Sequence, residues 1–116
     1  MRILIADDQR HARQSLKALV AVTHPEAEIL EAATGSEAVA LAGETRPGLV
    51  VLDVHMPELD GIEAAREIRS RWPEIRILVL TVDAACCRDA LAAGADAFVV
   101  KWEPPDRLMS VLSSLL

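Results

Sequence analysis

The sequence is short of cysteine, of basic charge and of long apolar runs, and each shortage excludes a class of protein. Its 2 cysteines, Cys86 and Cys87, are adjacent, so it is not a disulfide-rich secreted scaffold. Twelve basic residues against 18 acidic ones give a net charge of −6, which argues against direct nucleic-acid contact. No apolar run is long enough for a membrane span or a signal peptide, so we expect a cytoplasmic protein without membrane contact.

What the sequence does contain is a regular alternation of two kinds of segment. At 116 residues, the chain is long enough for one domain, 1–116, and it has no linker or repeat. Short apolar runs predict five strands, and amphipathic segments between them predict five helices. The strands are expected at 3–6, 28–32, 49–52, 75–81 and 97–100, and the helices at 10–23, 36–44, 61–71, 84–93 and from Pro105 onward. Ser36 is the expected N-cap of the second helix, and Gly94 the expected C-terminal cap of the fourth.

This alternation predicts an α/β fold with a doubly wound parallel sheet. The strand candidate Leu49–Leu52 is continuously apolar, as is typical of a strand covered on both faces. In such sheets ligands bind beyond the carboxyl ends of the strands. The residues that follow the strands are therefore the candidates for a functional site.

Three acids, a hydroxyl and an amine lie at the carboxyl ends of four of the predicted strands. They are Asp7, Asp8, Asp53, Thr81 and Lys101. At roughly 4–6 Å and an effective dielectric constant of about 20, each close pair of carboxylates costs about 3–4 kcal/mol. One lysine does not compensate three acids, so we expect a hard divalent cation, Mg²⁺, to bind there.

The positions of these residues suggest separate roles in phosphoryl transfer, which depends mainly on positioning and charge neutralisation. Asp53 ends the central strand and is the expected nucleophile and phosphoacceptor. Asp7 and Asp8 are the expected metal ligands together with Asp53, while Lys101 and Thr81 would contact phosphoryl oxygens. Taken singly, Asp8 could instead cap the first helix and Lys101 could be a solvated strand end. All of the site residues would then have to coincide at one edge by chance, so we favour the functional interpretation.

At these residues the chain resembles the receiver domain of bacterial two-component response regulators. The most specific segment is 53–61, which resembles the family's phosphoacceptor motif, and Asp7-Asp8 and the segment 94–101 also match. The resemblance covers residues 2–116. It implies a flavodoxin-like sheet with strand order 2-1-3-4-5.

The resemblance also implies function, partners and a switch. Asp53 would take a phosphoryl group from a sensor histidine kinase or a small acyl phosphate. The chain would be a phosphoacceptor that assists its own phosphorylation and dephosphorylation, and not an enzyme in the usual sense. Thr81 would move toward the phosphoryl group and Phe98, the single Phe in a chain without Tyr, would repack. The surface formed by the fourth helix, fifth strand and fifth helix would then change and control an attached or separate output domain, with phosphorylation-dependent homodimerisation.

Several positions depart from the family pattern or flank the site. Val82 stands where the family usually has Ala or Gly, so it could narrow access to Asp53. His55 and Asp83, two residues beyond Asp53 and Thr81, are predicted to tune the phosphoryl lifetime. Trp102 stands where many members have Pro or a small polar residue; it is expected either exposed beside the output surface or packed on the last helix, without a cis peptide bond.

Other interpretations are weaker. A haloacid-dehalogenase phosphatase would need a second Asp at the position of His55, together with a cap domain. A flavin-binding protein would need a hydroxyl-rich loop in place of Asp7-Asp8. A receiver-like interaction module that is never phosphorylated remains the main alternative. Cys86 and Cys87 have no metal-ligand spacing to other Cys or His residues, so we interpret them as small apolar residues at a helix start.

Overall fold

The computed structural model describes residues 1–101 and 103–116, and in these residues five parallel strands form one sheet. The strand order is β2-β1-β3-β4-β5, as the resemblance implied. The strands are β1 (Arg2–Ala6), β2 (Glu28–Ala32), β3 (Leu49–Leu52), β4 (Arg76–Thr81) and β5 (Ala97–Val100). The helical segments are α1 (Arg10–Thr23), α2 (Gly35–Thr45), α3 (Gly61–Arg71), the 3-10 turn η1 (Ala84–Cys86), α4 (Cys87–Ala92) and α5 (Pro105–Leu115).

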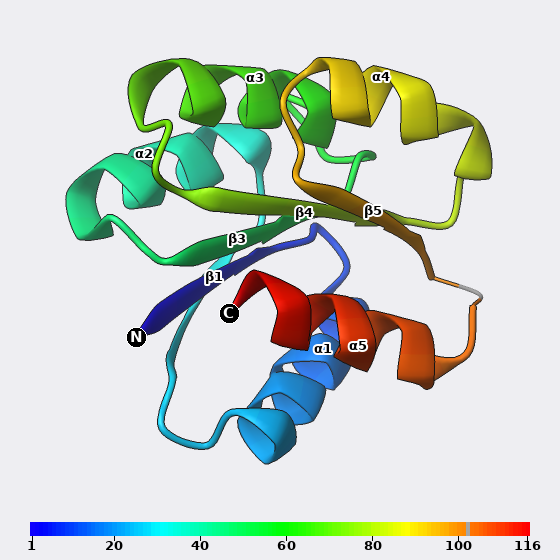
Figure 1. Cartoon of the computed structure of the whole chain (residues 1–116). Helices are drawn as coiled ribbons and strands as arrows, with labels where there is room; N and C mark the ends of the chain where they lie inside the picture. The colour runs from blue at the N-terminus through cyan, green and yellow to red at the C-terminus, as the bar shows by residue number, and fades with distance from the viewer. Residues whose placement is uncertain (102) are drawn as a thin grey trace.

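Helices cover both faces of the sheet. Figure 1 shows α2, α3 and α4 on one side and α1 and α5 on the other. Because successive side chains of a strand point to opposite faces, each central strand contributes to two separate cores. Leu4 of β1 packs in the core under α2, α3 and α4, whereas Ile5 packs in the core under α1 and α5. Each of these two side chains is fully buried and contributes about 1.5–3 kcal/mol to stability.

The predicted N-cap of the second helix was wrong by two residues. Thr34, not Ser36, caps α2, because the Thr34 hydroxyl accepts a hydrogen bond from the Glu37 amide at 3.0 Å. The Glu37 carboxylate in turn accepts from the Ala33 amide at 3.2 Å. Thr34 and Glu37 stand at the spacing of a capping box, a signal that the choice of Ser36 overlooked.

The fourth predicted helix is shorter than expected and begins as a 3-10 turn. The Asp83 carboxylate accepts from the Ala85 amide at 3.0 Å, and the Cys86 amide donates to the Asp83 carbonyl at 3.1 Å. These local bonds form η1 over Ala84–Cys86, and α-helical geometry starts only at Cys87. At the other end the prediction for Gly94 is confirmed: its φ is 108°, and the Ala95 amide beyond it reaches the Ala90 carbonyl at 3.1 Å.

Among the described residues, none of the helices combines the length and the apolar character that crossing a bilayer would require.

The prediction for Trp102 falls outside the described residues. Phe98 lies half-buried on β5 and packs against the core under α2, α3 and α4.

Candidate phosphoacceptor site

The three acids predicted from the strand ends meet at the carboxyl edge of the sheet. Asp7 and Asp53 follow β1 and β3, and the Asp53 amide donates to the carbonyl of Ala6 at 3.0 Å, which extends the pairing of these strands into the site. Carboxylate oxygens of Asp7, Asp8 and Asp53 all lie within 4.8 Å of one another. Asp7 and Asp53 are buried, at 3% and 8% exposure, and Asp8 is exposed. The site is therefore a partly enclosed acidic cluster with one open side.

Lys101 is the cation of this cluster. Its Nζ atom lies 2.7 Å from Asp7 Oδ2 and 3.3 Å from Asp53 Oδ2, and its side chain is only 20% exposed. The Lys101 amide donates to the Thr81 carbonyl at 2.9 Å, which fixes the start of the side chain beside β4. Lys101 is thus an ion-paired group and not a solvated strand end.

Burial and ion pairing act in opposite directions on Lys101. Burial alone would lower the pKa of its ammonium group. The hydrogen bond with Asp7 and the negative charges of Asp53 and Asp7 outweigh burial, so the pKa of Lys101 lies above its ordinary value. The ammonium group is therefore charged at neutral pH.

Local bonds hold Asp7 in place. Its Oδ1 atom accepts from the Gln9 amide at 2.9 Å, and its carbonyl accepts from the Arg13 guanidinium at 2.7 Å. Gln9 is the N-cap of α1 and no side chain caps that helix, so Asp8 does not serve as its cap. Asp8 is left free to face the cluster.

Thr81 lies fully buried at the end of β4. Its hydroxyl oxygen accepts from the Asp83 amide at 3.5 Å, a long hydrogen bond that leaves the hydroxyl proton available. Val82, the next residue, is 45% exposed. Thr81 thus lies at the same edge of the sheet as the acids, and its hydroxyl is hydrogen-bonded to the loop that follows β4.

The loop that follows Asp53 depends on close backbone approach. The Gly61 amide donates to the Val54 carbonyl at 2.9 Å, and a Cβ atom at Gly61 would overlap the Asp53 carbonyl group. Asp60 caps α3, since its Oδ1 atom accepts from the Glu63 amide at 2.9 Å. Glycine at 61 therefore lets α3 start directly against the backbone of Asp53.

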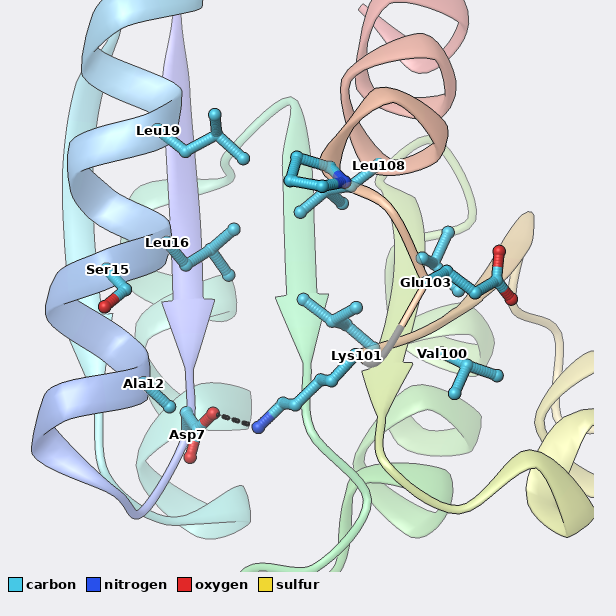
Figure 2. Close-up of a pocket in the computed structure, with 12 residues that line it drawn as sticks. Asp7, Ala12, Ser15, Leu16, Leu19, Val100, Lys101, Glu103 and Leu108 are labelled. Carbon is cyan, nitrogen blue, oxygen red and sulfur yellow. Dashed lines mark hydrogen bonds and ion pairs between the residues drawn. The ribbon is translucent and has the colours of Figure 1, made fainter.

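A hollow of about 250 Å³ opens beside the cluster, between α1 and α5. Figure 2 shows the Lys101 side chain extending across one end of it toward Asp7, with Leu16, Leu19 and Leu108 along its apolar wall. Asp7, which belongs to the acidic cluster, and Lys101 both line this hollow, so the hollow adjoins the cluster.

Sequence spacing missed one cluster at the same edge. The structure brings Cys86 together with His55 and Asp83, with one potential ligand atom of each within 4.8 Å of the others. Burial, and then the neighbouring Asp83 carboxylate, raise the pKa of the Cys86 thiol. His55 lies in the loop after β3, whereas Asp83 and Cys86 follow β4, so spacing around Cys86 gave no sign of His55.

The strand order and the polar residues at the carboxyl edge define a flavodoxin-like α/β domain of the receiver class. The family model of the response regulator receiver domain matches residues 3–113. The chain therefore belongs to the response regulator receiver family of two-component systems.

Relatives and solved structures agree with this assignment. The chain is 41% identical over 112 residues to the uncharacterized transcriptional regulatory protein YhcZ of Bacillus subtilis (strain 168), covering 94% of this chain and 52% of that protein. It is also 41% identical over 118 residues to the response regulator MprA of Mycobacterium sp. (strain KMS), covering 100% of this chain and 50% of that protein. The chain thus spans about half the length of these relatives.

Two solved structures share the fold closely. The response regulator TrrA of Thermotoga maritima, in complex with Mg²⁺-BeF, superposes with a TM-score of 0.92 at 34% identity, covering 99% of this chain and 98% of that one. A LuxR-family two-component response regulator of Aurantimonas sp. gives a TM-score of 0.91 at 34% identity, covering 98% of this chain and 83% of that one.

Proposed function

We propose that Asp53 accepts a phosphoryl group from a sensor histidine kinase or a small acyl phosphate, and that the phosphorylated domain controls an output. The observation that carries this proposal is the bridge from Lys101 to Asp7 and Asp53, at 2.7 Å and 3.3 Å, inside a cluster of three acids. A buried nucleophilic carboxylate beside a fixed ammonium group is suited to receive an anionic group. Attack by an Asp53 oxygen on phosphorus would break the phosphorus bond to the donor and form an aspartyl phosphate.

The acids also fit a magnesium ion. Their oxygens lie within 4.8 Å of one another, comparable to the roughly 4.2 Å between opposite oxygen ligands at the usual Mg²⁺ distance. Asp7, Asp8 and Asp53 would hold the ion. When bound, Mg²⁺ supplies positive charge that offsets the repulsion between these carboxylates and an incoming phosphoryl group.

Each remaining residue of the site has a role toward the phosphoryl group. Lys101 would form an ion pair with one phosphoryl oxygen. This ion pair would replace its present one with the Asp53 carboxylate. The Thr81 hydroxyl would donate a hydrogen bond to another phosphoryl oxygen, since in its present hydrogen bond with the Asp83 amide it acts only as acceptor. Movement of Thr81, with Phe98 repacking behind it, would change the surface of α4, β5 and α5.

The relatives support an output outside residues 1–116. Since the chain spans about half of each named relative, and one is named a transcriptional regulatory protein, we propose that the receiver domain 1–116 acts on an attached or separate effector, with dimerisation on phosphorylation. A domain that only binds a partner, without phosphorylation, is the competing function.

The deciding experiment is the intact mass of the protein after incubation with acetyl phosphate and Mg²⁺. We expect the wild type to gain one phosphoryl group and Asp53→Asn to gain none. Asp60→Asn is the matched control: Asp60 is a nearby acid outside the cluster, and Asn preserves the helix cap. No gain in the wild type, from acetyl phosphate or from any histidine kinase tried, would favour the interaction module.

His55 and Asp83 are proposed to tune the lifetime of the aspartyl phosphate. The structure holds His55 Nε2 3.7 Å from Asp83 Oδ2, with both side chains substantially exposed at 61% and 43%. This pair would flank the path of an attacking water. The lifetimes of phosphorylated His55→Ala and Asp83→Ala, measured by loss of the mass increment, should differ from wild type; unchanged lifetimes would contradict the proposal.

A further inference from the structure

His55, Asp83 and Cys86 form a second group of potential metal ligands, and it shares no residue with the acidic cluster. Asp83 Oδ2 lies 3.7 Å from His55 Nε2 and 3.4 Å from Cys86 Sγ. The three ligand atoms are an imidazole nitrogen, a carboxylate oxygen and a sulfur, all within 4.8 Å of one another. This donor set differs in kind from the oxygen-only set of Asp7, Asp8 and Asp53.

Hydrogen bonds to the backbone hold two of the three potential ligands, Asp83 and Cys86, in place. Asp83 uses its other oxygen, Oδ1, to accept from the Ala85 amide at 3.0 Å, so Oδ2 is turned toward His55 and Cys86. The Cys86 amide donates to the Asp83 carbonyl at 3.1 Å, which fixes the cysteine relative to the aspartate. Hydrogen bonds of this kind orient ligand side chains before a metal arrives.

The separations between the ligand atoms are close to those of a tetrahedral site. With metal distances of about 2.3 Å for sulfur and about 2.0–2.2 Å for nitrogen and oxygen, tetrahedral angles place neighbouring ligand atoms roughly 3.4–3.6 Å apart. The separation from Cys86 Sγ to Asp83 Oδ2, 3.4 Å, and that from His55 Nε2 to Asp83 Oδ2, 3.7 Å, each lie within roughly 0.3 Å of the tetrahedral value for their pair. The ligand atoms therefore need only small side-chain rotations to close on one ion.

We propose that His55, Asp83 and Cys86 bind one divalent transition-metal ion of the Zn²⁺ type at the mouth of the phosphoacceptor edge. Mixed nitrogen, sulfur and oxygen ligands select zinc and its neighbours, whereas Mg²⁺ prefers oxygen ligands alone. Three protein ligands and an exposed His55 leave the fourth position to water. As the bond between Cys86 Sγ and the metal forms, the thiol releases its proton to solvent.

Such an ion would join the loop after Asp53 to the loop after Thr81. His55 belongs to the first loop, and Asp83, whose amide contacts the Thr81 hydroxyl at 3.5 Å, belongs to the second. Holding Asp83 restrains the loop that follows Thr81. Bound zinc should therefore slow phosphorylation of Asp53; this consequence, unlike the binding itself, rests on the proposed function.

Binding is tested by titrating the reduced protein with Co²⁺, a spectroscopic substitute for Zn²⁺, in excess Mg²⁺ to occupy the acids. We expect one equivalent to bind with a thiolate-to-cobalt charge-transfer band, and Zn²⁺ to displace it. Cys86→Ser should abolish the band and His55→Gln should weaken binding at least about tenfold. Cys87→Ser, the adjacent thiol outside the group, should retain it. Absence of the band in the wild type, its persistence in Cys86→Ser, or its loss in Cys87→Ser would overturn the site.

The consequence is tested by the rate of phosphoryl gain from acetyl phosphate with and without Zn²⁺. We expect the wild type and Cys87→Ser to slow roughly threefold or more, and Cys86→Ser to be unaffected. Equal rates in the wild type despite a bound ion would overturn the regulatory role. A wild type that gains no phosphoryl group under either condition would instead refute the proposed function, while the cobalt titration still decides the metal site.

Discussion

Lys101 Nζ donates to Asp7 Oδ2 at 2.7 Å, although 94 positions separate the two residues in the sequence. Removing this amine leaves Asp7 and Asp53 buried without their cation. We expect Lys101→Met to lower the free energy of unfolding by about 1–3 kcal/mol in the presence of EDTA, measured by urea denaturation. Lys17→Met is the control, because Lys17 pairs with Glu31 while 42% exposed and should cost less than about 1 kcal/mol. Equal losses would contradict a special role for the Lys101 bridge.

Mg²⁺ should stabilise the folded protein through the acidic cluster. At a free Mg²⁺ concentration ten times the dissociation constant, the free energy of unfolding should rise by about 1.4 kcal/mol. Asp53→Asn removes one ligand and one repelling charge, so we expect it to be more stable than the wild type in EDTA and to gain less from Mg²⁺. Urea denaturation with EDTA and with Mg²⁺ measures both effects. An undiminished gain in Asp53→Asn would place the ion elsewhere.

The close approach of Gly61 to the backbone of Asp53 requires a residue without a side chain at position 61. A Cβ atom at this position would overlap the Asp53 carbonyl, so Gly61→Ala should destabilise the protein by about 1–3 kcal/mol or more and slow phosphorylation of Asp53. Thermal unfolding and the mass assay measure the two effects. At Gly48 the tightest contact of a Cβ atom would be with the end of the flexible Met1 side chain, at 3.2 Å, and the Arg2 carbonyl oxygen would lie at an ordinary 3.8 Å, so Gly48→Ala should be nearly neutral. The prediction fails if the two variants behave alike.

Glu31 should give the protein a pH-dependent part of its stability. It accepts from Arg13 at 2.9 Å, and also from Gln14 and Lys17, which ties α1 to β2. The hydrogen bond from Arg13, helped by Lys17 and opposed by burial, lowers the pKa of Glu31. A lowered folded pKa stabilises the protein above the unfolded value of about 4.3, and this contribution is lost as the pH falls through the folded pKa.

We therefore expect Glu31→Gln to cost about 1 kcal/mol at neutral pH, with the difference from wild type shrinking below about pH 4. Chemical denaturation across this pH range measures it. A difference that stays constant with pH would show that the charge of Glu31 contributes nothing.

Val82 should limit access of small donors to Asp53. Val82 directly follows Thr81 and is 45% exposed, so trimming its side chain leaves no cavity in a core. We expect Val82→Ala to raise the rate of phosphorylation by acetyl phosphate roughly threefold, about 0.6 kcal/mol in activation free energy. Val22→Ala, an exposed change on α1, is the control. An unchanged rate of phosphorylation in Val82→Ala would show that Val82 does not limit the access of acetyl phosphate to Asp53.

The order of the elements and the residues that end the strands follow from local patterns in the amino-acid sequence. Continuous apolar runs such as Leu49–Leu52 are buried on both faces wherever they are placed, and the acids after them must then lie at one edge. The sequence also contained the Thr34 cap of α2, through the capping-box spacing of Thr34 and Glu37, and the hydrogen bond between them confirms that cap. The strand order came from family resemblance, because periodicity says nothing about which strands are neighbours.

Contacts between side chains from distant strands and loops are visible only in the folded protein. Lys101 could have pointed to solvent, and its bridge to Asp7 and Asp53 depends on β1, β3 and β5 being held in register by a sheet whose pairings span most of the chain. Cys86 appeared to be an ordinary apolar residue until the loop after β4 placed it beside His55. Local sequence fixes backbone preference over a few residues, whereas contacts between distant loops depend on how the whole sheet is assembled.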